Sequence, residues 1–438
     1  MNLHPSNRRY KWYVVGMLWW IAFFNYADRQ SVFSLFPLLS REFHLSNLQL
    51  GLLGSSFAWV YGLSAPLAGN LADRIHRKTA ILGGLRVWSV ICMATALSRT
   101  FAQLLFFRAA EGLGETIYFP ASMSLLSDYH GKETRSRAIG IHQTSVYVGT
   151  IAGGFFAGLI GQHYGWRWSF VVFGGAGIVL SFILGRSLFE PARGAADLAD
   201  VTGEPIQAGL AHRTSIAEFI RLIRTNPTAL LCMAGFMCAN FTTMVLFTWM
   251  PTLLYQKFHL SLAMAGLTAT IYVQTTSMVG SPIGGWLADV LRRRMPGGRM
   301  VVQAIGIGLE APFAAWCALT GSFHWLIFSL LVWGIFKGFY EANIFASMFD
   351  VIQPEARGTA TGFMNMMGWL AGGGTAPAVV GFLADRIGLS RSVALTAFSY
   401  LAASILLSIG AFRFAPRDTQ RMEALLRSVK YSRAELGA

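Results

Sequence analysis

The sequence predicts an all-α membrane protein whose twelve transmembrane helices form two six-helix bundles. Three observations support this fold class: an apolar composition, a series of apolar runs of spanning length, and an internal repeat. Of the 438 residues, 54% are hydrophobic and 13% are charged, about half the charged fraction of a typical soluble protein. The net charge of +14 therefore indicates basic loops facing anionic lipid, and the sequence shows no aromatic and basic platform for nucleic acid.

Hydropathy places twelve apolar runs along the chain, each near the roughly 20 residues that a bilayer core requires. The first run is too long for the apolar region of a signal peptide, so we interpret it as a retained spanning helix. The expected spans are residues 12–36, 48–70, 79–97, 101–126, 137–159, 167–188, 227–254, 262–287, 300–319, 323–349, 359–384 and 391–414.

One long polar segment separates these spans into two sets of six. We predict an N-terminal bundle at residues 1–189, a cytoplasmic linker at 190–226, a C-terminal bundle at 227–414 and a cytoplasmic tail at 415–438. The linker is expected to contain a short amphipathic helix at 216–223. The tail is amphipathic and basic, which is typical of a segment that lies on the membrane surface.

Short matches relate the two halves at a nearly constant separation. Residues 36–46 match residues 250–261, residues 69–73 match residues 285–289, and Glu115 corresponds to Glu341. Two parallel six-helix repeats are the architecture of many secondary transporters, which bind substrate near the bilayer midplane. The matches also pair His44 with His259 at loop positions, where we expect a turn or cap role.

The topology follows from the basic residues. Most of the 35 Lys and Arg side chains fall in alternate loops and in the two tails, so the positive-inside rule places both termini in the cytoplasm. We expect a multi-pass protein of the cell (inner) membrane, functioning as a monomer in the lipid bilayer. The four cysteines lie in apolar runs without metal or redox spacing and are interpreted as packing residues. No metal, no cofactor and no enzymatic activity are predicted.

Charged residues inside the predicted spans mark the functional site. Asp28 and Arg29 lie in the first span, where each costs about 2.5–3.5 kcal/mol on insertion scales. Arg108, Glu111 and Glu115 recur at helical spacing in the fourth span and therefore share one helix face. Because three charges cannot face lipid, we expect this face to point into the bundle, toward the first span.

These charges predict coupling between a proton and an anion. A buried carboxylate is kept ionised by a nearby Arg and favours a proton when that Arg is withdrawn. An anionic substrate that competes for Arg29 or Arg108 would thus promote protonation of Asp28 or Glu115, as symport requires. The alternative is that the charges are ion pairs that only fix helix packing.

Residues 69–78, with Gly69, Asp73, Arg74, Arg77 and Lys78, resemble the signature loop of the major facilitator superfamily. The family usually has Gly where this chain has His76. The resemblance extends over the whole chain and implies the fold described above. It also implies that Asp73 binds a neighbouring cytoplasmic helix end and acts as a gate latch.

Residues 25–29 and 57–62, together with the Arg108, Glu111 and Glu115 spacing, resemble the anion:cation symporter family. Members of that family move sugar acids and other organic anions together with protons. The resemblance implies that Asp28 and Glu115 carry protons, and we group Glu111 with them as a proton-coupling residue.

The same resemblance implies which residues contact the anion. Arg29, Tyr26 and Tyr61 would bind it, Arg108 would pair with Asp28, and Asn365 matches a span 11 position of the family. Val146 and Trp369 depart from the family's polar residues. These departures put the contacts to sugar hydroxyls in doubt and favour a less hydroxylated anion.

A second family competes with the first. Residues 112–116, 65–69 and 190–193 resemble the spinster-type lipid transporters, whose substrates are lysolipids or sphingoid phosphates. We therefore expect a proton-coupled symporter of a small organic anion, working by alternating access, or alternatively a proton-dependent transporter of lysolipids or other amphipathic substrates. A membrane sensor is a remote third possibility.

Overall fold

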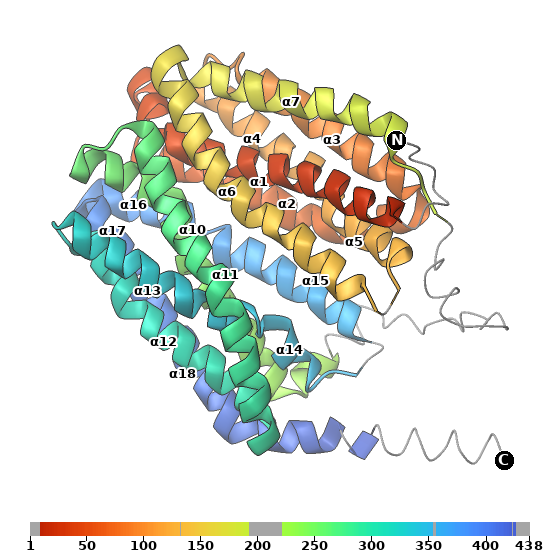
Figure 1. Cartoon of the computed structure of the whole chain (residues 1–438). Coiled ribbons are helices and arrows are strands. Elements are labelled where there is room, and N and C mark those ends of the chain that lie inside the picture. The colour runs from red at the N-terminus through yellow and green to blue at the C-terminus, as the bar shows by residue number, and fades with distance from the viewer. Residues whose placement is uncertain (1–8, 132, 192–220, 354–355, 423, 426–438) are drawn as a thin grey trace. The chain divides into compact units, whose positions relative to one another are not determined.

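The computed structural model describes residues 9–131, 133–191, 221–353, 356–422 and 424–425, and its secondary structure in these ranges is helical (Figure 1). The first set of helices is α1 (Tyr10–Phe43), α2 (Asn47–Arg74), α3 (Arg77–Thr95), α4 (Phe101–Glu115), α5 (Tyr118–Tyr129), α6 (Arg135–Tyr164) and α7 (Trp166–Ser187). The second set is α10 (Pro227–Phe258), α11 (Leu262–Arg294), α12 (Gly298–Leu319), α13 (Phe323–Glu341), α14 (Ile344–Phe349), α15 (Arg357–Met367), η2 (Gly368–Gly373), α16 (Ala376–Ile387), α17 (Leu389–Leu395), α18 (Ala397–Ile409) and η3 (Gly410–Phe414).

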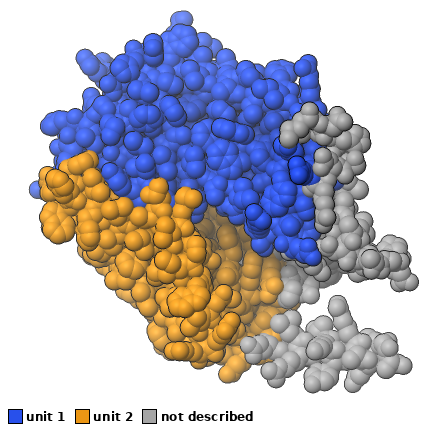
Figure 2. Space-filling view, viewed as in Figure 1, with its two compact units in different colours: residues 1–208, 244–274, 374–392 blue, residues 209–243, 275–373, 393–438 orange. Residues whose placement is uncertain are grey.

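The chain divides into two compact units, coloured separately in Figure 2. The first unit comprises residues 1–208, 244–274 and 374–392, and the second comprises residues 209–243, 275–373 and 393–438. The first unit therefore holds α1 to α7 together with one end of α10 and α11 and all of α16. The bundle boundaries predicted from the sequence stay predictions.

Eight helical segments of the described chain are long and apolar enough to cross a membrane. The other predicted spans correspond to α1, α3, α4 with α5, and α11, each of which carries charged side chains. The amphipathic helix expected at 216–223 lies largely outside the described residues. Of the tail expected at 415–438, residues 415–422 and 424–425 are described, and they are helical.

The paired histidines do form helix caps, as predicted. His44 follows the end of α1 with φ of 52°, and His259 follows the end of α10 with the same φ. The serine two residues later then begins the next helix in both places. Ser46 accepts a hydrogen bond from the Gln49 amide at 3.2 Å, and Ser261 accepts one from the Met264 amide at 3.3 Å. A left-handed residue followed by a serine N-cap turns the chain sharply between two spans.

Two predicted spans are broken at matching points. The span at 101–126 divides into α4 and α5 around residues 116–117, directly after Glu115. The span at 323–349 divides into α13 and α14 around residues 342–343, directly after Glu341. Hydropathy cannot detect these breaks, because the residues on both sides of each break are apolar.

Small residues bring α6 close to α1. A side-chain carbon added at Gly153 would lie 2.2 Å from the Ala27 carbonyl oxygen, and one added at Gly149 would lie 2.5 Å from that of Phe23. Only glycine allows so close an approach of two helix backbones. The α6 contact therefore fixes the position of α1 at the residue that precedes Asp28.

Candidate functional site

Asp28 lies on α1 and is 3% exposed. Its Oδ1 atom accepts a hydrogen bond from the Cys92 thiol of α3 at 3.1 Å. One carboxylate oxygen of Asp28, one of Glu111 and the Cys92 sulfur lie within 4.8 Å of one another. Among the described residues, no Lys or Arg nitrogen approaches the Asp28 carboxylate to within the 4.0 Å of an ion pair. Asp28 is thus a buried acid whose neighbours are a thiol and a second acid.

Arg29, the next residue on α1, faces a different set of groups. Its Nε atom donates to Oε2 of Glu115 at 2.5 Å, and the Glu115 side chain is fully buried. The guanidinium carbon lies 4.5 Å from the ring centre of Tyr61 and 5.0 Å from those of Tyr26 and Phe57. Aromatic faces of this kind attract a guanidinium, so Arg29 is held by one carboxylate within a cage of three rings.

Arg108 of α4 pairs with Glu111, one helical turn along the same helix, and both side chains are buried. The Arg108 guanidinium also lies 5.1 Å from the Phe57 ring centre. This pairing corrects the one implied by family resemblance, in which Arg108 would bind Asp28. The i, i+3 partner is available without any movement of α1, and it leaves Asp28 without a cation.

The five charged residues predicted from the sequence therefore come together in the first unit, where they form two ion pairs and leave one acid, Asp28, in excess. Carboxylates and thiolates also bind transition metals, and the group of Asp28, Cys92 and Glu111 is close enough to hold an ion. The prediction that the protein needs no metal is not tested by this geometry.

The loop between α2 and α3 is part of a second cluster. Arg77, 1% exposed, pairs with Asp128 at the end of α5 and with Glu190 after α7, the latter through Nε and Oε1 at 3.1 Å. Glu190 also accepts hydrogen bonds from the backbone amides of Arg77 and Lys78, at 2.9 and 3.2 Å. Burial acts to raise the pKa of Glu190. The hydrogen bonds and the Arg77 guanidinium outweigh this effect and hold the pKa below its usual range.

The second unit repeats part of this cluster. Arg299, at the start of α12, donates to Asp350 at 2.7 Å and to Asp289 at 2.9 Å. Arg299 follows Arg77, and Asp350 follows Asp128, by the same number of residues. The repeat thus preserves an Arg–Asp pair that joins the third and fourth spans of each half.

The remaining predicted residues are placed as follows. Arg74 is exposed at the end of α2, and the Lys78 ammonium lies 5.7 Å from the Phe189 ring centre. Gly69 and Asp73 lie within α2, but the surroundings of their side chains fall outside the described part of the chain. Asn365 is half-buried on α15, in the second unit.

Sequence reasoning missed two members of the site. Cys92 was interpreted as a packing residue, and Phe57 belonged to a recognised motif without an assigned role. Neither spacing nor charge identifies them, because each acts through contacts to another helix. The available signal was a cysteine on α3, a helix that packs against the charged helix α4.

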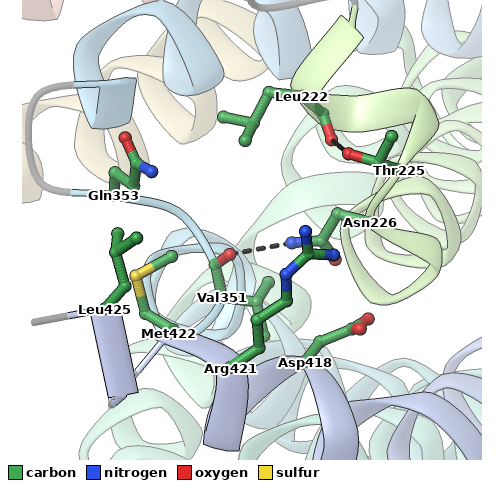
Figure 3. Close-up of a pocket in the computed structure, with 9 residues that line it drawn as sticks. All are labelled: Leu222, Thr225, Asn226, Val351, Gln353, Asp418, Arg421, Met422 and Leu425. Carbon is green, nitrogen blue, oxygen red and sulfur yellow. Dashed lines mark hydrogen bonds between the residues drawn. The ribbon is translucent and has the colours of Figure 1, made fainter.

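A cavity of about 130 Å³ also lies in the second unit (Figure 3). Asn226, Asp418 and Arg421 line it, and the side-chain amide of Asn226 donates a hydrogen bond to the Val351 carbonyl oxygen at 2.8 Å. None of the predicted site residues borders this cavity.

The helical fold, the matching breaks and the buried charges define a multi-pass membrane transporter. The family model of the Major Facilitator Superfamily matches residues 18–377, and the chain belongs to this superfamily. Its members are transporters rather than enzymes, which agrees with the absence of a catalytic motif in the sequence.

Relatives fall into the two groups that the motifs resemble. "Protein spinster" of Drosophila melanogaster is 25% identical over 86% of this chain and 63% of its own length. "Ascorbate transporter, chloroplastic" of Arabidopsis thaliana is 27% identical over 76% of this chain and 62% of its length. The chain thus spans somewhat under two thirds of these relatives. "Probable galactarate/D-glucarate transporter" of Escherichia coli (strain K12) is 24% identical over 95% of both chains.

Solved structures share the fold. A bacterial homolog to the human lysosomal transporter spinster, in an inward-facing and occupied conformation, matches with a TM-score of 0.80 at 21% identity. The match covers 94% of this chain and 99% of that structure. At this identity the likeness establishes the major facilitator fold.

Proposed function

We propose that the protein is a proton-coupled symporter of a small organic anion. The observation that carries this proposal is the Arg29–Glu115 ion pair at 2.5 Å inside a cage of aromatic rings. A guanidinium is the side chain best suited to bind a carboxylate through two parallel hydrogen bonds. Here that guanidinium is already occupied by an internal carboxylate, which a substrate carboxylate can replace.

Replacement provides the coupling. When a substrate anion takes Arg29, the fully buried Glu115 loses its counter-charge, and an uncompensated buried carboxylate costs several kcal/mol. Uptake of a proton by Glu115 removes that cost. Proton and substrate then bind together, and the linkage is reciprocal because each favours the other by the same free energy.

Asp28 supplies the second part of this mechanism. Its carboxylate faces that of Glu111 and lies beyond ion-pair distance of both arginines. Two buried acids that face one another are most stable when they share one proton. We assign this proton to the Asp28–Glu111 pair and propose that Arg108 keeps the pair from holding two.

Transport by purified protein in proteoliposomes tests the proposal. Sugar acids and simple carboxylates are supplied outside, and a pH gradient, inside alkaline, is imposed. Accumulation of an anion that stops when a protonophore collapses the gradient supports symport. Equal accumulation with and without the gradient would show that protons are not coupled.

The second candidate is proton-dependent transport of lysolipids or other amphipathic substrates. The similarity to "Protein spinster" and to the spinster-homolog structure favours it, as does the aromatic cage, which can also pack against an apolar ligand. Thermal stabilisation of the purified protein by lysolipids, with none by organic anions, would favour this candidate over the first.

The relatives whose names include anion, ascorbate or galactarate/D-glucarate transport support the anion class. We propose that the protein works as a monomer by alternating access in the cell membrane, with both termini in the cytoplasm. Protease or labelling access to the two tails in oriented membranes checks that orientation.

A further inference from the structure

A further buried acid lies in the second unit, apart from the site described above. Glu310 is on α12 and is 1% exposed. Its Oε2 atom accepts a hydrogen bond from the Trp333 indole at 3.0 Å. Its Oε1 atom has no hydrogen-bond partner among the described residues. A carboxylate in this setting is poorly compensated, because one neutral donor replaces several water molecules.

The surroundings of Glu310 provide no cation at ion-pair distance. Lys337 of α13 pairs with Glu341 at 2.7 Å, and no described Lys or Arg nitrogen comes within 4.0 Å of Glu310. The indole that donates to Glu310 also contacts the Tyr400 hydroxyl of α18 at 3.1 Å. The titratable and charged groups that face Glu310 or its neighbours are Lys337, Tyr340, Glu341, Tyr400, Cys232 and Cys238.

The charge balance of this interior matches that of the first unit. Around Asp28, three carboxylates accompany the guanidinium groups of Arg29 and Arg108. Around Glu310, two carboxylates accompany the ammonium group of Lys337. Each interior therefore contains one carboxylate more than its cations neutralise, and in each the excess acid accepts a hydrogen bond from a neutral donor, Cys92 or Trp333.

We propose that Glu310 is a further proton-binding site, so that each unit holds a protonated acid before substrate binds. The proposal deepens the proposed function, on which it rests for its role in transport. Protonation turns the unpartnered oxygen into a hydroxyl and neutralises the excess charge. The Trp333 indole continues to donate to the carbonyl oxygen of the neutral acid, so this hydrogen bond holds the side chain in both states.

Infrared spectroscopy of the purified, reconstituted protein tests the site without any substrate. A protonated carboxyl group has a C=O stretching band that an ionised carboxylate lacks and that shifts in heavy water. Glu310→Gln should remove one component of this band at neutral pH. The control variant Glu190→Gln should leave the band unchanged, because Glu190 is ion-paired with Arg77 and lies in the other unit.

Trp333→Phe provides a second measurement if Glu310→Gln folds poorly. Loss of the indole donor should move the Glu310 component to higher frequency and leave the component that Asp28→Asn removes. A band that neither Glu310→Gln nor Trp333→Phe alters means that Glu310 is ionised, and this overturns the proposal. If the Glu310 band is present while no pH-driven flux is found, the proposed symport fails and the proton site stands.

Discussion

Asp28 and Arg29 are adjacent in sequence, yet they contact different partners. Consecutive residues of a helix point about 100° apart, so α1 directs the acid toward Cys92 and Glu111 and the guanidinium toward Glu115 and the aromatic cage. One helix can therefore hold the proposed proton site and the proposed anion site side by side without pairing them to each other. In the proposed mechanism, that separation allows both groups to change partners.

Arg29→Lys tests the proposed anion site. Lysine keeps the charge but lacks the planar guanidinium group, with its paired N–H donors and most of its stacking on aromatic rings. We expect the apparent KM for the transported anion to rise about tenfold, which corresponds to about 1.4 kcal/mol. The exposed Arg86 provides the control, since Arg86→Lys should leave the uptake kinetics unchanged. Equal kinetics for Arg29→Lys and wild type would remove Arg29 from the substrate site.

Glu190→Gln tests the cluster of Arg77, Asp128 and Glu190 through the pH dependence of stability. The folded-state pKa of Glu190 is depressed, so its ionised form stabilises the fold above its unfolded pKa of about 4.3, and this contribution is lost as pH falls through the folded-state value. The variant should lose about 1 kcal/mol at neutral pH and approach wild type in acid. Thermal melts across pH, with the exposed Glu133→Gln as control, measure this, and a pH-independent difference would contradict it.

At the scale of whole elements, the contact between α1 and α6 fixes where the charged residues of α1 lie along the helix bundle. A carbon added at Gly153 meets the Ala27 carbonyl oxygen at 2.2 Å, so Gly153→Ala must push α1 away at the residue before Asp28. We expect a loss of about 1–3 kcal/mol from overpacking, seen as a lower melting temperature and slower uptake. Gly175→Ala on α7, where nothing lies within 4 Å, should melt like wild type. Two variants of equal stability would show that α6 does not constrain α1.

The elements also show what the sequence can and cannot predict. Hydropathy and repeats predicted the spans, and the His44 and His259 pair predicted the caps. The charged residues of the site were found because charge is rare in a spanning helix. Which acid pairs with which arginine was not predictable, because it depends on how α1 is rotated about its axis and shifted along it relative to α4. The breaks after Glu115 and Glu341 were missed because they change backbone direction without changing polarity.

At the scale of the whole molecule, residues from distant parts of the chain join within the first unit. Asp385 at the end of α16 accepts hydrogen bonds from the Asn47 amide at 2.9 Å, the Asn47 side chain at 2.8 Å and the Leu48 amide at 3.0 Å. A carboxylate at this position caps the N-terminus of α2 and complements its dipole. A segment from each predicted bundle is thereby tied together at one end.

Asp385→Ala should loosen that connection. Ser55 of α2 is buried and accepts a hydrogen bond from the Ala378 amide of α16, so Ser55→Cys reports on separation of the two helices. We expect maleimide to label this cysteine about fivefold faster in the Asp385→Ala background, the effect of losing about 1 kcal/mol of hydrogen bonding. Unchanged labelling would mean that the cap does not hold the helices together.

Glu115→Gln most directly tests the proposed coupling, because Glu115 is the acid proposed to take up the coupled proton when the substrate anion binds Arg29. Reconstituted protein is assayed in two modes, exchange of labelled for unlabelled anion and accumulation driven by a pH gradient. Because glutamine cannot bind or release that proton, the variant should retain exchange and lose gradient-driven accumulation. Full accumulation by Glu115→Gln, at the wild-type dependence on the gradient, would contradict the assignment of the coupled proton to this site.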